Sequence, residues 1–168
     1  MSAQAALVLV LLAGLPAAWG APAEPLAKTP SLSWEAPEQV RAGEQFSAVL
    51  RLSSHQPLRG LPLLLGFDTQ TLQVVTVKEG EFFKQANGRT VFNQRVDASA
   101  GKIVVSVVRQ SVSGRDPGIN GAGGVVVVTF KALKAGTVAK LRLLSAAPDP
   151  APGSPVAVPV ERSVRVVR

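Results

Sequence analysis

Alternation of apolar and polar residues is the feature that most constrains how this chain can fold. Between Phe46 and Ser53 the pattern repeats with a period of two, and an apolar residue that could face the core occupies every second position. This period is typical of a β-strand that buries one face. Similar segments recur from Leu32 onward, separated by turn residues, and no segment has a convincing helical period. We therefore expect one all-β domain over residues 32–168, a β-sandwich of about nine strands.

Turn residues set the expected strand boundaries. Asp68 separates the strand 61–67 from a second strand over 72–77, because an Asp side chain can bond the backbone two residues on. A Gly-containing loop, 98–101, joins strands 91–97 and 102–109 into a hairpin. We expect turns or loops at 53–60, 111–124 and 146–159, the last either a loop over the sandwich or a linker. Further strands are expected at 125–132, 138–144 and 163–168, and a short helical turn at 82–86.

The N-terminus resembles a secretory signal. Residues 1–20 contain no charged side chain, and the apolar run from Ala5 to Leu15 is followed by Pro16 and small residues. Residues 1–20 are therefore predicted to be a signal peptide, and 21–31 a flexible Pro-rich leader. The run is shorter than the ~20 residues of a membrane span, so we expect a secreted or periplasmic protein with no span after cleavage.

Composition excludes several classes of protein. The chain has no Cys, so an exported domain of this kind must be held together by its core rather than by disulfides. The formal net charge of +7 is spread along the chain without a basic tract, and aromatic residues make up 5%. Nucleic-acid binders interleave basic and aromatic side chains, so we expect no nucleic-acid partner. A basic surface suits an acidic protein or anionic envelope lipids.

The residues needed for catalysis are scarce. His55 is the single histidine and lies in a polar segment without a neighbouring carboxylate, so neither a catalytic triad nor a zinc site is expected. The acidic candidates for glycoside hydrolysis lie in or beside expected turns, where acids usually bond the backbone; they are Asp68, Glu79, Glu81, Asp97 and Asp116. No Asp-x-Asp spacing supports a calcium site. We expect a protein without catalytic activity, without a metal site that the sequence identifies and without a cofactor; whether a calcium ion binds at the acidic turns stays open.

Sugar recognition would need exposed aromatic rings. After removal of the signal peptide Trp34 is the one tryptophan, and its alternation with Leu32 favours packing over sugar binding. The Phe82-Phe83 pair is the other candidate, because adjacent aromatic residues cannot both face inward from an extended strand, although a capping turn would bury both. A carbohydrate-binding module that uses Trp34 and Phe82 is the alternative.

Two motifs resemble those of cohesin domains. The first is Gly66-Phe67-Asp68-x-x-x-Leu72, followed by Gly80 and the Phe82-Phe83 pair. The second is the apolar run 124–132, followed by a Gly136 turn and a strand over 138–144. The resemblance covers roughly residues 32–168. It implies a jelly-roll sandwich that docks a protein partner, either dockerin-like or an envelope secretion component, with a possible link to polysaccharide degradation.

The resemblance also implies where a partner would bind. The family uses the sheet whose strands correspond to residues 61–67, 91–97 and 102–110. Along the second of these, Phe92 and Val96 share one face and leave the polar residues on the other. The predicted partner-binding residues are Asn93, Arg95, Asp97 and Arg109. Whether the partner is a dockerin, a polysaccharide or a secretion-machine subunit stays open at this point.

Overall fold

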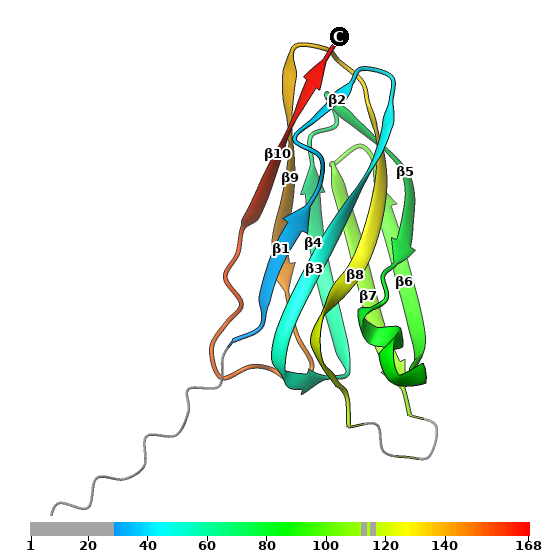
Figure 1. Ribbon diagram of the computed structural model, residues 1–168, viewed down its shortest axis with the longest axis vertical. Helices are drawn as coiled ribbons and strands as arrows, with labels where there is room; N and C mark the ends of the chain where they lie inside the picture. The colour runs from blue at the N-terminus through cyan, green and yellow to red at the C-terminus, as the bar shows by residue number, and fades with distance from the viewer. Residues whose placement is uncertain (1–28, 112–113, 115–116) are drawn as a thin grey trace, which may run out of the picture.

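The structure is a computed structural model that describes residues 29–111, 114 and 117–168. The described part is a sandwich of two β-sheets with one short 3-10 helix (Figure 1). The predicted signal peptide and most of the predicted leader lie outside the described residues. The elements are β1 (Ser31–Glu35), β2 (Gln39–Arg41), β3 (Gln45–Leu58), β4 (Gly60–Phe67), β5 (Leu72–Glu79), η1 (Phe82–Asn87), β6 (Arg89–Asp97), β7 (Lys102–Gln110), β8 (Ile119–Ala132), β9 (Thr137–Ala146) and β10 (Val160–Val167).

The two sheets differ in width. The first contains four strands in the order β1-β3-β8-β5, and the second contains six in the order β2-β10-β9-β4-β7-β6. Neighbouring strands are antiparallel except for β2 and β10, which run parallel. The predicted jelly-roll β-sandwich is confirmed, with ten described strands instead of about nine.

The alternation seen in the sequence becomes the core. In β3, Phe46, Ala48, Leu50 and Leu52 are all buried, while their polar neighbours lie outside. The ring of Phe130 on β8 lies 5.8 Å, centroid to centroid, from the rings of both Phe46 and Phe67. Because Phe67 belongs to the six-stranded sheet and Phe130 to the four-stranded one, these rings join the two layers.

The turn at Asp68 forms as predicted. One carboxylate oxygen of Asp68 accepts the backbone N–H of Gln70 at 2.9 Å, and the Asp68 carbonyl accepts the N–H of Leu72 at the same distance. The side chain therefore takes the place of a backbone partner at the start of β5.

Two expected loops are instead strand. β3 continues to Leu58 and β8 begins at Ile119, so the expected turn at 53–60 was wrong over 53–58 and the expected loop at 111–124 was wrong over 119–124. The two segments pair with each other, with Ser54 opposite Gly121 and Leu58 opposite Ile119. His55 consequently lies on a strand, where it is exposed.

The Pro-rich segment after β9 is a loop over the sandwich. Its Val156 is buried, and Asp149 exchanges backbone hydrogen bonds with Gly60 at 2.9 and 3.3 Å. The segment 146–159 is therefore a loop over the sandwich and not a linker.

The predicted helical turn is η1, and it buries both rings of the Phe82-Phe83 pair. Phe82 is 0% exposed and Phe83 is 1% exposed, and the rings meet edge to face with centroids 4.9 Å apart. In Figure 1, η1 lies at the lower end of the sandwich beside β6, β7 and β8. It covers the core at that end.

Candidate partner-binding face

The six-stranded sheet has one face on the core and one face toward solvent, which we call the outer face. Strand β7 shows the division clearly. Ile103, Val105 and Val107 are buried, whereas Val104 is 51% and Val108 is 44% exposed. Alternate residues of the strand therefore belong to the core and to the outer face.

Three of the four predicted binding residues lie together on the outer face. Phe92 and Val96 of β6 pack against the core, so Asn93, Arg95 and Asp97 face outward and are exposed. Across the ladder to β7, Asn93 is opposite Ser106, Arg95 is opposite Val104, and Asp97 is opposite Lys102.

The outer face also carries apolar side chains that were not predicted. Val91, 40% exposed, is opposite Val108, and Leu64 of β4 is opposite Val104. We call these four residues together with Pro62 the valine strip. The sequence contained the signal, because the run 103–108 is apolar at almost every position and thus apolar on both faces of its strand.

Asp97 has its carboxylate engaged in its own hairpin loop. One oxygen accepts the backbone N–H of Ala100 at 2.9 Å and the hydroxyl of Ser99 at 2.7 Å. The Ala100 N–H, and then the Ser99 hydroxyl, stabilise the charged form and lower the pKa of Asp97. The outer face thus keeps a negative charge next to Lys102 at neutral pH.

Arg109 does not join the other three residues. It follows Ile103, Val105 and Val107 in the alternation and points toward η1. Its Nη1 donates to the carbonyl oxygens of Phe83 at 2.6 Å and Gln85 at 3.0 Å. The structure therefore corrects its predicted place on the outer face: Arg109 holds the turn that buries the two phenylalanines.

The candidates for sugar binding are not presented to solvent as ring platforms. Phe82 is fully buried, which corrects its assignment as a possible sugar platform. Trp34 lies on the same side of β1 as the buried Leu32, is partly buried against the core, and has a buried Nε1. Its packing role is the one favoured by the sequence.

The acidic residues considered for catalysis are engaged with backbone or with a cation where the structure describes them. Glu81 accepts the N–H of Gly124 at 2.8 Å, and Glu79 lies 3.1 Å from Nζ of Lys84. Asp116 lies outside the described residues. Among the residues that the structure describes, no group of three or more His, Asp or Glu could hold a metal ion.

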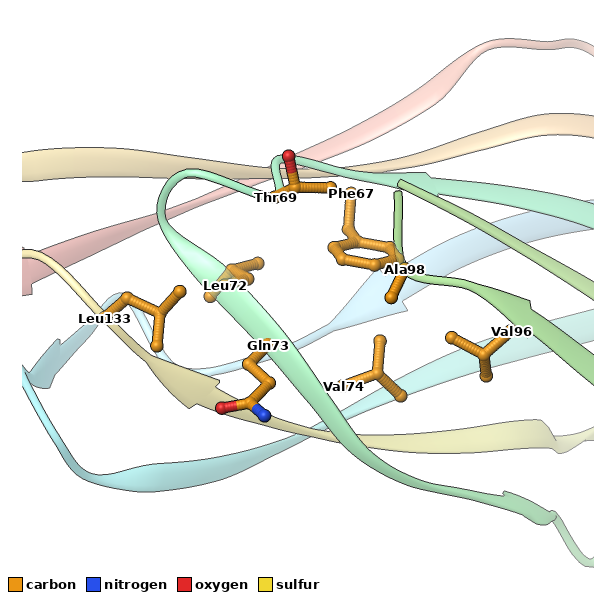
Figure 2. Close-up of a pocket in the computed structure, with 8 residues that line it drawn as sticks. All are labelled: Phe67, Thr69, Leu72, Gln73, Val74, Val96, Ala98 and Leu133. Carbon is orange, nitrogen blue, oxygen red and sulfur yellow. The ribbon is translucent and has the colours of Figure 1, made fainter. Parts of the chain in front are cut away.

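A hollow of about 270 Å³ opens beside the Asp68 turn, between β5 and β6 (Figure 2). Val74 of β5 and Val96 of β6 line the hollow, and the buried Phe67 and Leu72 line it on the core side. Its polar lining consists of Thr69 and Gln73, so the hollow offers no titratable group for acid-base chemistry.

The described residues form a jelly-roll sandwich whose six-stranded sheet presents exposed apolar side chains on its solvent face. The Cohesin domain family matches residues 31–149 of this chain. The chain belongs to the cohesin domain family. This confirms the resemblance inferred from the two motifs.

Solved cohesin structures share the fold at low sequence identity. The third cohesin of ScaC from Acetivibrio cellulolyticus, in complex with the ScaB dockerin, superposes with a TM-score of 0.67 and 14% identity over 83% of this chain and 100% of that chain. The second type II cohesin module of ScaA from the same organism gives 0.65 and 15%, covering 80% and 90%. The OlpA cohesin of Clostridium thermocellum, in a type I cohesin-dockerin complex, gives 0.62 and 13%, covering 83% and 100%.

Comparison with curated proteins gives no significant match. Within the described ranges, no helix is long and apolar enough to cross a membrane.

Proposed function

We propose that this protein is a non-catalytic binding module that docks a protein partner of the dockerin type on the outer face of its six-stranded sheet. The observation that carries the proposal is the valine strip, a row of exposed apolar side chains on strands whose opposite face is the core. Residues on a rigid scaffold lose little conformational freedom when a partner binds them.

The two outer surfaces of the sandwich differ in a way that favours this sheet. On the four-stranded sheet, the solvent side carries hydroxyl and amide groups such as Ser47, Thr129 and Gln73. The four-stranded sheet also exposes Val75 of β5, at 42%, whereas the six-stranded sheet exposes Val91, Val104 and Val108 on the paired strands β6 and β7. Contiguous exposed apolar surface with a polar rim is characteristic of protein-protein interfaces.

Family membership supports the kind of partner. Two of the similar cohesins described above were solved in complexes with dockerins. Those proteins are binding modules, and in the present chain the carboxylates of Asp68, Asp97 and Glu81 accept backbone N–H groups. A role as a docking module therefore explains the exposed valines without requiring catalysis.

Export is part of the proposal. Residues 1–20 have the length and composition of a signal peptide, which places the mature protein in the periplasm or the medium. N-terminal sequencing of the exported form should begin at Ala21. An intact Met1 in the membrane fraction would contradict this part of the proposal.

The test is capture of a dockerin-bearing protein from source-cell extract, with mass spectrometry to identify it. Val104→Asp and Arg95→Ala change two residues that lie opposite each other across β6 and β7. Hot-spot residues typically weaken binding by 2 kcal/mol or more when truncated, so each variant should lose at least about tenfold in affinity. Thr129→Asp, on the outer side of the other sheet, is the matched control and should bind normally.

Two other outcomes would assign a different function. Binding to insoluble polysaccharide that Trp34→Ala abolishes, with no protein captured by the wild type, would indicate a carbohydrate-binding module. Capture of envelope secretion components without any dockerin would indicate an accessory subunit of a secretion machine. Equal loss in Val104→Asp and Thr129→Asp would contradict docking on the outer face.

A further inference from the structure

The outer face continues beyond the valine strip onto a group of basic residues. They lie on β9, β10 and β2, the three strands on the far side of β4. By strand alternation Ala139, Leu141 and Leu143 face the core, which places Lys140 and Arg142 of β9 on the outer face. The same reasoning places Arg165 of β10 and Arg41 of β2 there, since Val164, Val166 and Val40 are buried. We call Arg41, Lys140, Arg142 and Arg165 the basic border.

The basic border and the valine strip form one continuous surface. Gly66 of β4 is opposite Lys102 of β7 on one side and Arg142 of β9 on the other. Because Gly66 has no side chain, Leu144 packs over it, and a Cβ at this position would lie 3.1 Å from Cδ1 of Leu144. Apolar contact surface therefore leads directly from Val104 to the basic side chains.

The basic border forms no ion pair among the described residues, although Glu161 of β10 lies opposite Arg142 in the strand register. By alternation, the whole outer face carries seven basic residues and two acidic ones; the basic residues are Arg41, Arg89, Arg95, Lys102, Lys140, Arg142 and Arg165, and the acidic ones are Asp97 and Glu161. Such an excess attracts an oppositely charged partner and accelerates encounter.

Three kinds of anionic partner are conceivable, a membrane, a nucleic acid and a protein, and the side chains of the outer face favour a protein. Helices and loops that lie on membranes insert Trp, Phe or Leu into the lipid, and single-stranded nucleic acids stack on aromatic rings. All described Phe side chains are buried or packed against the core. The leucines of the outer face, Leu64 and Leu144, are half-buried, and its exposed side chains include short, stiff valines beside guanidinium groups. Arg binds carboxylates through two parallel hydrogen bonds.

We propose that the partner is an acidic protein that places apolar side chains on the valine strip and carboxylates on the basic border. This inference rests on the proposed docking function. It also predicts the distance between the two kinds of contact group on the partner, because neighbouring strands lie about 4.8 Å apart. The partner's carboxylates should therefore lie roughly 10–14 Å from its apolar anchors, the distance from β7 to β9 and β10.

The test uses the full chain, immobilised, and a phage-displayed library of random twelve-residue peptides. The wild type should enrich peptides with both apolar and acidic residues, with at least about a threefold excess of Asp and Glu over the starting library. The acidic excess should disappear with R142E/R165E. It should persist with K78E/K131E, the matched control that makes the same charge change on the four-stranded sheet. V104S/V108S should lose the enriched peptides.

The outcomes separate this inference from the proposed function. Apolar peptides without acidic excess, lost in V104S/V108S but retained by R142E/R165E, would overturn the acidic partner and leave docking on the outer face intact. An acidic excess that K78E/K131E also abolishes would indicate a net-charge effect and overturn the inference. No enrichment by the wild type would overturn both.

A vesicle arm distinguishes a membrane as the anionic partner. The wild type should not bind vesicles of phosphatidylglycerol more than vesicles of phosphatidylcholine at 150 mM salt. Binding to phosphatidylglycerol that R142E/R165E abolishes would assign the basic border to lipid headgroups and overturn the acidic protein partner.

Discussion

Arg95 and Arg109 illustrate how position in a strand decides what a residue does. They lie on adjacent strands of the same sheet, yet Arg95 faces solvent and Arg109 donates to two carbonyl oxygens of η1. Both were predicted to lie at a partner interface, because the resemblance to cohesins assigned binding to the strands that carry them. The alternation from Ile103 to Val107 would have put Arg109 on the core side.

Arg109→Ala should destabilise the protein by about 1.5–3 kcal/mol, because hydrogen bonds from a charged donor are stronger than neutral ones. The Phe83 and Gln85 carbonyls would both lose this donor, although Gln85 keeps the N–H of Gly88 at 3.2 Å. Urea denaturation followed by fluorescence measures the change. Arg95→Ala is the control and should stay within about 0.5 kcal/mol of the wild type. Equal losses in the two variants would contradict the assignment of Arg109 to η1.

Glu81 gives the protein a predictable acid dependence. The N–H of Gly124 stabilises its carboxylate and lowers the pKa of Glu81 from its ordinary value of 4.5, although partial burial opposes the shift. A pKa that is lower in the folded state stabilises the protein above the ordinary value, and this contribution is lost as pH falls through the folded value.

Glu81→Gln should therefore reduce the free energy of unfolding at pH 7, by about 1 kcal/mol after allowance for solvent screening. The difference from the wild type should shrink as pH falls from 5 to about 2. Urea midpoints at several pH values test this, with Glu161→Gln as an exposed control. A difference that stays constant over this range would contradict the role of the Glu81 charge.

At the scale of elements, the junction of β5, η1 and β8 depends on glycine. The N–H of Gly80 donates to the carbonyl of Val125 at 2.8 Å, and the backbone of Gly124 lies directly against Gly80. A Cβ on Gly80 would overlap the Gly124 carbonyl group and lie 2.9 Å from the backbone nitrogen of Val125. Backbone cannot move aside as a flexible side chain can, so the chain enters η1 without a side chain at this point.

Gly80→Ala should cost about 1–3 kcal/mol of stability, as expected when a well-packed site receives an extra carbon. Gly153→Ala, where nothing lies within 4 Å of the added carbon, should change the stability by less than about 0.5 kcal/mol. Thermal unfolding of the two variants tests the prediction. Similar melting temperatures would show that the junction adapts.

Local signals predicted most elements, and they failed where two weak segments support each other. Ser54 and Pro57 made the end of β3 look like a turn, and Gly121, Gly123 and Gly124 made the start of β8 look like a loop. Each has low strand propensity alone. Their pairing across the four-stranded sheet supplies the hydrogen bonds that neither sequence indicates.

The outer face likewise could be predicted from local sequence only in part. Asn93, Arg95 and Asp97 could be placed on one face of β6 from alternation alone, and the structure places them there. The valine strip needed the order of the strands, because Val91 comes to lie opposite Val108, and Leu64 opposite Val104, only through the pairing of β6, β7 and β4. The role of these residues in binding stays a prediction.

For the whole molecule, the three phenylalanines that join the layers should dominate stability. Phe130 is 1% exposed and contacts the rings of Phe46 and Phe67. Phe130→Ala should cost about 3–5 kcal/mol through lost burial and the cavity left behind. Phe92→Ala, at a partly buried position, should cost less. Urea midpoints that shift equally in both variants would contradict a shared core centred on Phe130.

The parallel pairing of β2 with β10 has a mechanical consequence. Thr29 lies near the start of β10, beside Val160, whereas Arg168 follows its end, so the two ends of the described chain lie at opposite ends of the sandwich (Figure 1). A tensile force applied between them would first load β1, which pairs with β3 in the four-stranded sheet, and beyond β1 would pull β2 and β10 in opposite directions along their length. The hydrogen bonds from Ala42 to Val167 and from Arg165 to Glu38, 2.9 Å each, would then bear the load together in shear rather than open one after another. The same ladder that completes the six-stranded sheet would thus resist extension between the two ends of the described chain.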